Sequence, residues 1–484
     1  MLQHLKNETN YTQTTNGETT HKTSNSDLLD FFSTAGAARH WNEAQVISAF
    51  NKAYNENPAY ALKALFYFRD VRGGQGERKL FRTIAKHLAN TNPASLAPFV
   101  NLIPHYGRWD DLLSLFDTPL ELSAIQVIAE QWNKDVASAN AGESTSLMFK
   151  WLPSINASSE DTKAAARKIL KAIQLTPVQY RKTLSNMRRF LDVVEVKMSA
   201  KEWSEINYAK LPSQASLKNR TAFFRNDEDR YRAFLDSIEK GEVKVNASTL
   251  YPYQLVEKVS YYRSSDESLL NAMWENLPDY IDGKDSNAIA VIDVSGSMSG
   301  TPMEVAVSLG MYMAERNKGA FHNHFITFSA NPELVEIKGE TFCDRVRNIK
   351  SSDWGYNTNL ERVFLLLLNT AKRNKLPQSD LPSSLYVISD MQFDSAFSGS
   401  KNQTFFNKMK KLFEDNGYTL PKIIFWNVDA HHGQSPVLQN TENVQLVSGF
   451  SSSLFESLMK QNEYNPYEMM MAILDAERYQ LISL

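Results

Sequence analysis

The first part of the chain is dominated by apolar residues at three- and four-residue spacing, which is the pattern of amphipathic helices. The breaks between them hold glycine or proline, as at Gly73, Gly74 and Pro93. The expected helices cover 43–55, 58–70, 77–90, 94–103, 108–116 and 119–139, and helical patterns continue over 159–191 and 198–240. Short helices with tight joints are typical of an α-solenoid of packed helix pairs.

Past residue 284, apolar runs of strand length alternate with helical segments. The first run, 288–292, has no polar alternation, which indicates a strand covered on both faces. The expected strands are 288–292, 322–328, 333–338, 384–390, 421–428 and 443–447, and the expected helices are 302–317, 341–349, 360–374, 404–415, 452–461 and 466–480. This alternation predicts a doubly wound α/β sheet.

These patterns divide the chain into three parts. Residues 1–26 are rich in Thr, Asn, Gln and Ser and have little to bury, so we expect a disordered tail. Residues 27–283 form the expected α-helical domain, and residues 284–484 form the expected α/β domain. The predicted fold class is therefore a multidomain α plus α/β protein, with an α-solenoid followed by a doubly wound sheet.

Composition places the protein among ordinary globular chains, with 42% apolar and 22% charged residues. The single cysteine, Cys343, excludes an internal disulfide and suits a reducing compartment. The start of the sequence shows no signal-peptide pattern, and no run of 18 apolar residues could span a membrane. We therefore expect a cytoplasmic protein without a membrane partner.

The net charge of −3 hides a local excess of basic residues. Residues 163–232 carry 16 Lys or Arg and only 7 Asp or Glu. Within this segment Arg181, Lys182, Arg188 and Arg189 recur at spacings of seven, so they can share one face of a helix. Such a stripe is a candidate RNA-binding site through the phosphates, and its alternative is an ordinary solvated face.

Two further segments, 69–78 and 104–112, are more specific in sequence than packing requires. The first contains three glycines, with Arg69, Arg72 and Arg78 nearby, and its backbone N–H groups could cradle a phosphate. It lacks the lysine and the serine or threonine of a P-loop, so it gives no support for nucleotide hydrolysis. A helix–helix turn capped by glycine is the interpretation that we favour.

The apolar run 288–292 is followed at once by Asp293, Ser295 and Ser297. Ligand sites in open α/β sheets lie where the strands end. One carboxylate and two hydroxyl groups on alternate residues supply hard oxygen ligands, which suit Mg²⁺ or another divalent cation. The alternative for an isolated match is a turn in which a serine caps the next helix.

This motif resembles the metal-ion-dependent adhesion site of von Willebrand factor A domains. The resemblance implies two further ligands from later loops, Thr358 before the expected helix 360–374 and Asp390 at the end of the expected strand 384–390. Many family members carry an acidic residue after the threonine, whereas this chain has Asn359. That difference removes a nearby negative charge and bears on metal affinity more than on metal geometry.

The whole chain resembles the Ro-like family, which is related to the Ro (TROVE) proteins. The resemblance implies a ring of HEAT-like repeats and an RNA-binding scaffold for small noncoding or single-stranded RNA. It also implies an A domain that binds a protein partner through its metal. The segments that carry it are 69–78, 106–112, 180–185, 202–208, 211–215 and 293–297.

Two other functions stay open at this point. One is a metal-dependent protein-interaction adaptor without an RNA role. The other is an enzyme in which the metal activates water, and this would need a base near the site. His431 and His432 follow a strand and could approach the metal site. A phosphatase-type site with Asp293 as nucleophile needs a second aspartate two residues on, where this chain has Ser295. We therefore expect a binding protein with no catalytic residues.

Overall fold

The computed structural model describes residues 9–260, 262, 264, 266–282, 287–328, 331–351, 359–393, 404–431, 433–459 and 465–483. The chain forms two compact units. The first joins residues 1–64 to 247–480, and the second contains residues 65–246 with 481–484. This division differs from the expected boundary after residue 283, because the N-terminal segment folds with the sheet; residues 283–286 themselves lie outside the described part.

The core of the first unit is a six-stranded sheet with the order β5-β4-β3-β6-β7-β8. Only β4 and β5 pair antiparallel, and the other pairs are parallel. The strands are β3 (Ala288–Asp293), β4 (His324–Phe328), β5 (Glu333–Glu336), β6 (Ser384–Ser389), β7 (Lys422–Asn427) and β8 (Val444–Ser448). The predicted helical N-terminal region and mostly parallel C-terminal sheet are thus confirmed.

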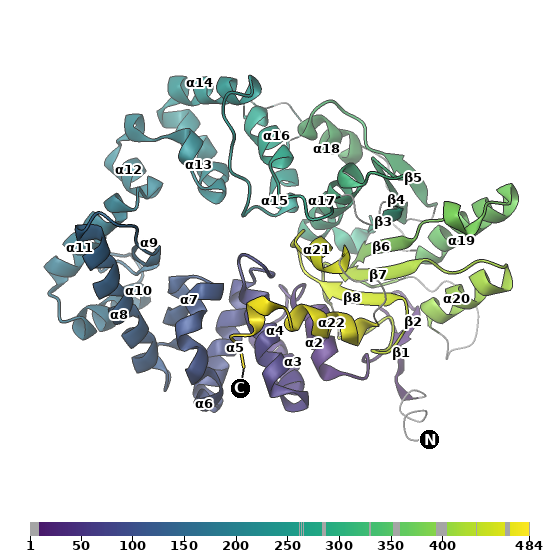
Figure 1. Cartoon of the computed structure of the whole chain (residues 1–484), viewed down its shortest axis with the longest axis horizontal. Helices are drawn as coiled ribbons and strands as arrows, with labels where there is room; N and C mark the ends of the chain where they lie inside the picture. Colours follow the sequence, from purple (N-terminus) through teal and green to yellow (C-terminus); the bar gives the residue numbers. More distant parts are fainter. Residues whose placement is uncertain are drawn as a thin grey trace. The chain divides into compact units, whose positions relative to one another are not determined.

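Helices lie on both faces of this sheet (Figure 1). Adjacent residues of a strand point to opposite faces, so each strand contributes side chains to both layers. On one face Phe455 of α21 contacts Trp426 of β7 and Tyr312 of α17, while on the other Phe425 of β7 contacts Phe393. Close packing of α17 depends on Gly310, since a Cβ there would lie 2.1 Å from Ile292 Cδ1. The helices are α15 (Pro252–Val256), α16 (Glu267–Glu275), α17 (Thr301–Arg316), α18 (Phe342–Lys350), α19 (Leu360–Asn374), α20 (Phe405–Asp415), α21 (Leu454–Met459) and α22 (Pro466–Leu474).

The N-terminal segment of the first unit is ordered from residue 9, so the prediction of a disordered tail is wrong for residues 9–26. It forms an antiparallel hairpin, β1 (Tyr11–Gln13) with β2 (Thr19–His21), and then α2 (Asp27–Ala35) and α3 (Glu43–Glu56). A polar composition predicts little self-burial, but the hairpin obtains its hydrogen bonds from loops nearly 400 residues away, as between Thr14 and Phe393.

The second unit is helical. Helix α4 (Pro58–Arg69) carries the chain into it from the first unit. Its helices are α5 (Arg78–Thr91), α6 (Pro93–Leu96), α7 (Ile103–Tyr106), α8 (Glu121–Asn140), α9 (Met148–Trp151), α10 (Glu160–Ala172), α11 (Pro177–Phe190), α12 (Val194–Ala200), α13 (Ser213–Asn226) and α14 (Glu228–Glu239), with 3₁₀ turns at Ala97–Leu102, Trp109–Leu115, Trp203–Glu205 and Tyr208–Lys210. No described helix is both long and apolar enough to cross a bilayer.

The segments 69–78 and 104–112 pack against each other inside the second unit. Arg69 is buried and its Nη2 lies 2.7 Å from Oδ2 of the equally buried Asp111. The same carboxylate accepts a hydrogen bond from Arg82 Nε. Gly107 is required at this junction, because a Cβ there would lie 2.4 Å from Asp111 Oδ2 and 2.9 Å from Arg69 Nε. The contacts support the helix–helix turn over a phosphate cradle, since Arg69 is already neutralised.

Candidate functional site

The first candidate site lies where β3 and β6 end. The chain passes from β3 to β4 on one side and later to β6 on the other, so the strand order reverses between β3 and β6. Crevices at such reversal points are the usual ligand sites of open α/β sheets. Asp293 is the last residue of β3, and Asp390 follows the last residue of β6.

Asp293 is fully buried and is held by hydrogen bonds to both carboxylate oxygens. Ser389 Oγ donates to Oδ2 at 2.6 Å, and the backbone N–H of Ser295 donates to Oδ1 at 2.9 Å. Burial, followed by the nearby Asp390 carboxylate, raises the pKa of Asp293. Each carboxylate disfavours the ionisation of the other, and a proton on one of them or a bound cation would relieve this repulsion.

Asp390 is 1% exposed and only one of its oxygens has a donor. The backbone N–H of Gln392 donates to Oδ1 at 3.0 Å. Oδ2 is buried and accepts no hydrogen bond within the described part of the chain. A buried carboxylate oxygen without a donor carries a desolvation cost that a metal ion would offset.

His431, in the loop after β7, approaches this pair as the sequence suggested. Its Nε2 lies 3.6 Å from Asp390 Oδ2 and 3.5 Å from Asp429 Oδ2. The contact with Asp390, and then the charge of Asp429, raise the pKa of His431. His432 lies outside the described residues.

The described residues of this site fit a divalent cation by their chemistry. Ser295 Oγ and Ser297 Oγ are 3.0 Å apart, and Ser297 is exposed to solvent. No three His, Cys, Asp or Glu side chains cluster as metal ligands in the described part of the chain, so a cation here would depend on these hydroxyl groups. Thr358 lies outside the described residues. Asn359, where many A domains are acidic, instead caps α19 by accepting from the N–H of Arg362.

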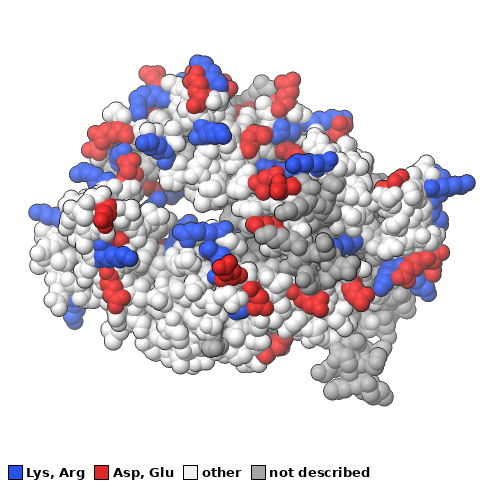
Figure 2. All heavy atoms as spheres, in the orientation of Figure 1, with Lys and Arg blue, Asp and Glu red and all other residues white. Residues whose placement is uncertain are grey.

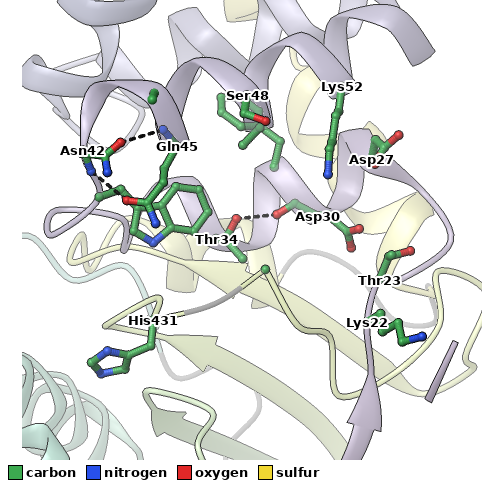
Figure 3. Close-up of a pocket in the computed structure, with 15 residues that line it drawn as sticks. Lys22, Thr23, Asp27, Asp30, Thr34, Asn42, Gln45, Ser48, Lys52 and His431 are labelled. Atoms are coloured by element: carbon green, nitrogen blue, oxygen red, sulfur yellow. Dashed lines mark hydrogen bonds between the residues drawn. The ribbon is translucent and has the colours of Figure 1, made fainter. Parts of the chain in front are cut away.

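A cavity of about 510 Å³ lies next to His431 in the same unit (Figure 3). Helices α2 and α3 supply most of its wall, while His431 approaches from the loop after β7. Lys22, Lys52, Asp27 and Asp30 all line it, and burial raises the pKa of Asp30 to about 7, so Asp30 offsets the lysines only in part near neutral pH.

The second candidate site is a groove of about 980 Å³ in the helical unit. Seven of its lining residues are Lys or Arg, and only Glu195 is acidic. The cations come from segments far apart in the sequence: Arg78, Arg108, Lys150, Arg181, Arg188, Arg189 and Lys218. A concave surface with such an excess focuses a positive potential.

Three of the four predicted RNA-binding residues line this groove. Arg181, Arg188 and Arg189 face it from α11, whereas Lys182 is exposed and is not among the lining residues. Lys182 is displaced by about 100° around the helix from Arg181, because an α-helix has 3.6 residues per turn. The other α11 residues that line the groove are Leu184 and Ser185.

Arg188 builds the wall of the groove as well as charging it. Its guanidinium donates to the backbone carbonyls of Phe149 and Leu152 and to Ser154 Oγ, at 2.7–2.9 Å. These acceptors are neutral, and burial lowers the pKa of Arg188. Arg188 therefore fixes α11 to the end of α9 while its positive charge stays without a carboxylate among the described contacts.

Sequence reasoning missed the aromatic part of the groove. Trp151 is half-buried there, with Arg108 at 4.4 Å and Lys150 at 5.5 Å from its ring centre. Burial, and then the neighbouring Arg69, lower the pKa of Arg108. The sequence did hold a signal for two cations of the groove, since Arg78 and Arg108 lie in the segments 69–78 and 104–112, which are more specific than packing requires.

The basic excess is confined to such local regions. Figure 2 shows Lys and Arg intermixed with Asp and Glu over the visible face of the molecule, in keeping with a net charge of −3. The aromatic residues near the predicted stripe mostly belong to the core, as Tyr180 and Phe223 do, while Phe190 is 45% exposed.

Two family models match the chain. Residues 14–121 and 120–294 match the domain of unknown function DUF2828, and residues 287–480 match the domain of unknown function DUF7788. "Uncharacterized protein L728" of Acanthamoeba polyphaga mimivirus is 32% identical over 508 residues, covering 96% of this chain and 87% of that protein. Among solved structures, the Ro (RSR) protein of Deinococcus radiodurans is similar with a TM-score of 0.42 and 13% identity, covering 94% of this chain and 100% of that chain.

Proposed function

The chain belongs to the DUF2828 family, and from that premise we propose that it is an RNA-binding scaffold with a separate, cation-dependent site for a protein partner. In this proposal the helical unit is a HEAT-like solenoid and the sheet unit is a von Willebrand factor A-like domain. The observation that carries the RNA role is the groove with seven cations and one carboxylate.

A polyanion is the ligand that this groove suits best. Arg78, Arg181, Arg189 and Lys218 are exposed along it and free to meet phosphates, while Arg188 adds a charge fixed in the wall. Trp151 supplies a surface on which an unpaired base could stack. The groove therefore supports small noncoding or single-stranded RNA, in line with the sequence resemblance to the Ro-like family.

The sheet unit is proposed to bind Mg²⁺ or another divalent cation. Asp293, Ser295, Ser297 and Asp390 would hold it, with Thr358 as the remaining ligand implied by the resemblance. The cation would neutralise the buried carboxylates and leave a coordination position for an oxygen ligand from a partner. This role needs no catalytic residue, and His431 acts in it as a neighbour of the Asp390 carboxylate.

The RNA proposal is tested by measuring binding of a fluorescent single-stranded RNA of mixed sequence over a range of salt concentrations. Arg181→Glu/Arg189→Glu should weaken binding and reduce the slope of log affinity against log salt by about 0.7 for each phosphate that the protein no longer neutralises. A matched control is Lys171→Glu/Lys182→Glu, since both lysines are exposed and neither lines the groove.

Stronger weakening by the groove variant than by the control supports RNA binding in the groove. Equal weakening by the two variants, which change the net charge equally, would contradict it. The absence of salt-dependent RNA binding in the parent protein would favour the alternative function, a metal-dependent protein-interaction adaptor without an RNA role.

A further inference from the structure

The N-terminal hairpin runs across loops at the carboxyl end of the sheet. On one side it adds to the loop after β7: His21 and Ser435 exchange two backbone hydrogen bonds of 3.0 Å each. Thr20 Oγ1 also donates to Ser435 O at 2.8 Å. The hairpin is thus joined by backbone pairing to the loop that contains His431.

The turn of the hairpin contacts the loop that begins with Asp390. Thr14 Oγ1 donates to Phe393 O at 2.7 Å, and Asn16 Nδ2 donates to Gln392 O at 2.6 Å. The backbone N–H of Thr15 donates to Gln392 Oε1 at 2.9 Å. Gln392 in turn donates its N–H to Asp390 Oδ1 at 3.0 Å. A short chain of hydrogen bonds therefore leads from the hairpin to a carboxylate of the candidate cation site.

The same hairpin is tied to the helices beside the site by a buried charge. Glu18, which follows the turn, is 2% exposed and lies 3.0 Å from Lys408 Nζ on α20. Glu361 in the first turn of α19 is also buried and interacts electrostatically with both Glu18 and Lys408. The hairpin is therefore linked to α20 by an ion pair and to the first turn of α19 by an electrostatic interaction.

We propose that the N-terminal hairpin is a strap that positions the cation site, with Thr14, Asn16 and Gln392 as positioning residues. The proposal rests on the proposed function of that site. The loop needs an external support, because Met391 has a left-handed backbone with φ of +63°, uncommon for a side chain of this type. A cation such as Mg²⁺ tolerates little deviation in the position of its ligands.

An isolated two-stranded hairpin is marginally stable in water, so this one depends on its contacts with the loops. Docking of the hairpin and binding of the cation then favour each other. Linkage requires the effect to be reciprocal: whatever factor the docked hairpin adds to cation affinity, the cation adds to hairpin docking.

The experiment measures Mg²⁺ binding by calorimetry for the parent, for Thr14→Val/Asn16→Ala and for Gln13→Ala. The double variant removes two side-chain contacts to the Asp390 loop without changing the loop itself, and should lower Mg²⁺ affinity about 5-fold or more. Gln13→Ala is the matched control, because its exposed side chain lies in the same hairpin, and it should bind like the parent.

A second measurement uses the unmodified protein and so does not depend on the folding of a variant. Trypsin cleavage after Lys22, an exposed residue just past β2, should slow several-fold when Mg²⁺ is added. Equal cleavage rates with and without saturating Mg²⁺ would overturn the strap, and so would unchanged Mg²⁺ affinity in the double variant.

Asp293→Ala separates the strap from the site on which it rests. Parent affinity in the double variant, alongside loss of binding in Asp293→Ala, would overturn the strap and leave the cation site standing. Absence of Mg²⁺ binding in the parent would overturn the cation site itself, and the strap with it.

Discussion

The carboxyl end of the sheet in the first unit, called the sheet edge below, and the groove of the second unit carry charges of opposite sign. At the sheet edge, Asp293 and Asp390 are buried carboxylates of like charge, and one oxygen of Asp390 has no donor among the described residues. In the groove, seven cations face a single carboxylate. In the proposed function the first arrangement would bind a small cation and the second an extended anion.

A second contrast lies within the helical unit. Arg69 is fully buried and paired with Asp111, whereas Arg181 and Arg189 are exposed in the groove. All three arginines lie in segments that the sequence analysis singled out as candidate phosphate-binding sites. Only the arginines without a paired carboxylate can offer their charge to a ligand. Pairing in the structure, more than charge in the sequence, separates structural from ligand-binding cations.

The largest expected effect is at the sheet edge. Asp390→Asn should abolish Mg²⁺ binding, and with it the stabilisation that Mg²⁺ gives, which is about 2.7 kcal/mol at 100 times the dissociation constant. In EDTA the same variant should unfold at a higher temperature than the parent, because the repulsion with Asp293 is gone. Thermal unfolding with Mg²⁺ and with EDTA measures both. A variant that is less stable than the parent in EDTA would contradict this account of the carboxylate pair.

The next effect separates the paired arginine from the groove. Asp111→Asn should lower the free energy of unfolding by about 3–5 kcal/mol, because it leaves Arg69 buried without its partner charge. Asp117→Asn is the control: that carboxylate is 82% exposed and pairs with Lys168 at the surface, where a pair contributes about 1 kcal/mol or less. Urea denaturation gives both values. Similar small decreases in the two variants would mean that the 69–78 segment is not held by this pair.

A smaller effect distinguishes base contacts from phosphate contacts in the groove. Trp151→Leu should weaken single-stranded RNA binding by about tenfold, within the 1–3 kcal/mol per stacked base, and should leave the salt slope unchanged. Phe190→Leu is the control, since that ring is exposed on α11 and does not line the groove. A changed salt slope with Trp151→Leu would show that the ring only positions Arg108 and Lys150.

The smallest effect concerns pH. Burial, and then the Glu18 carboxylate, raise the pKa of Glu361 to about 7, with Lys408 and Arg362 opposing the shift. An unfolded carboxyl group ionises near 4.5, so stability should fall as pH rises from about 5 to 8. Between pH 5 and 8, Glu361→Gln should reduce the decrease in unfolding temperature by about 1–2 °C. The control Glu414→Gln, at an exposed position, should leave that decrease unchanged. Parallel pH profiles for the parent and Glu361→Gln would contradict the assignment.

Much of the fold could be predicted because local pattern dominates it. Helix 360–374 matches α19 residue for residue, and the expected strands match β3 to β8 to within about two residues, in keeping with unbroken apolar runs. The hairpin could not be predicted, because its hydrogen bonds to Gln392 and Phe393 depend on tertiary contacts that composition does not report.

The sites divide in the same way. The Asp293 motif lies in one loop and could be read directly, whereas Asp390 was implied by the resemblance to von Willebrand factor A domains. The groove draws Arg78, Arg108 and Lys218 from distant segments, so only its α11 part, Arg181 to Arg189, had a local signal. Lys182 does not line the groove although Arg189, seven residues later, does, so the spacing of seven alone does not decide which cations face it.

The most direct test of the central claim is ultraviolet crosslinking of the protein to the RNA that copurifies with it after a moderate-salt wash. The RNA should be sequenced and the crosslinked peptides mapped. The account predicts discrete RNA species and crosslinks in two groove segments, 150–156 and 181–200. The strongest crosslinks are expected at Trp151, in the first of these segments. Crosslinks confined to the sheet unit, or a protein that carries no enriched RNA, would contradict it.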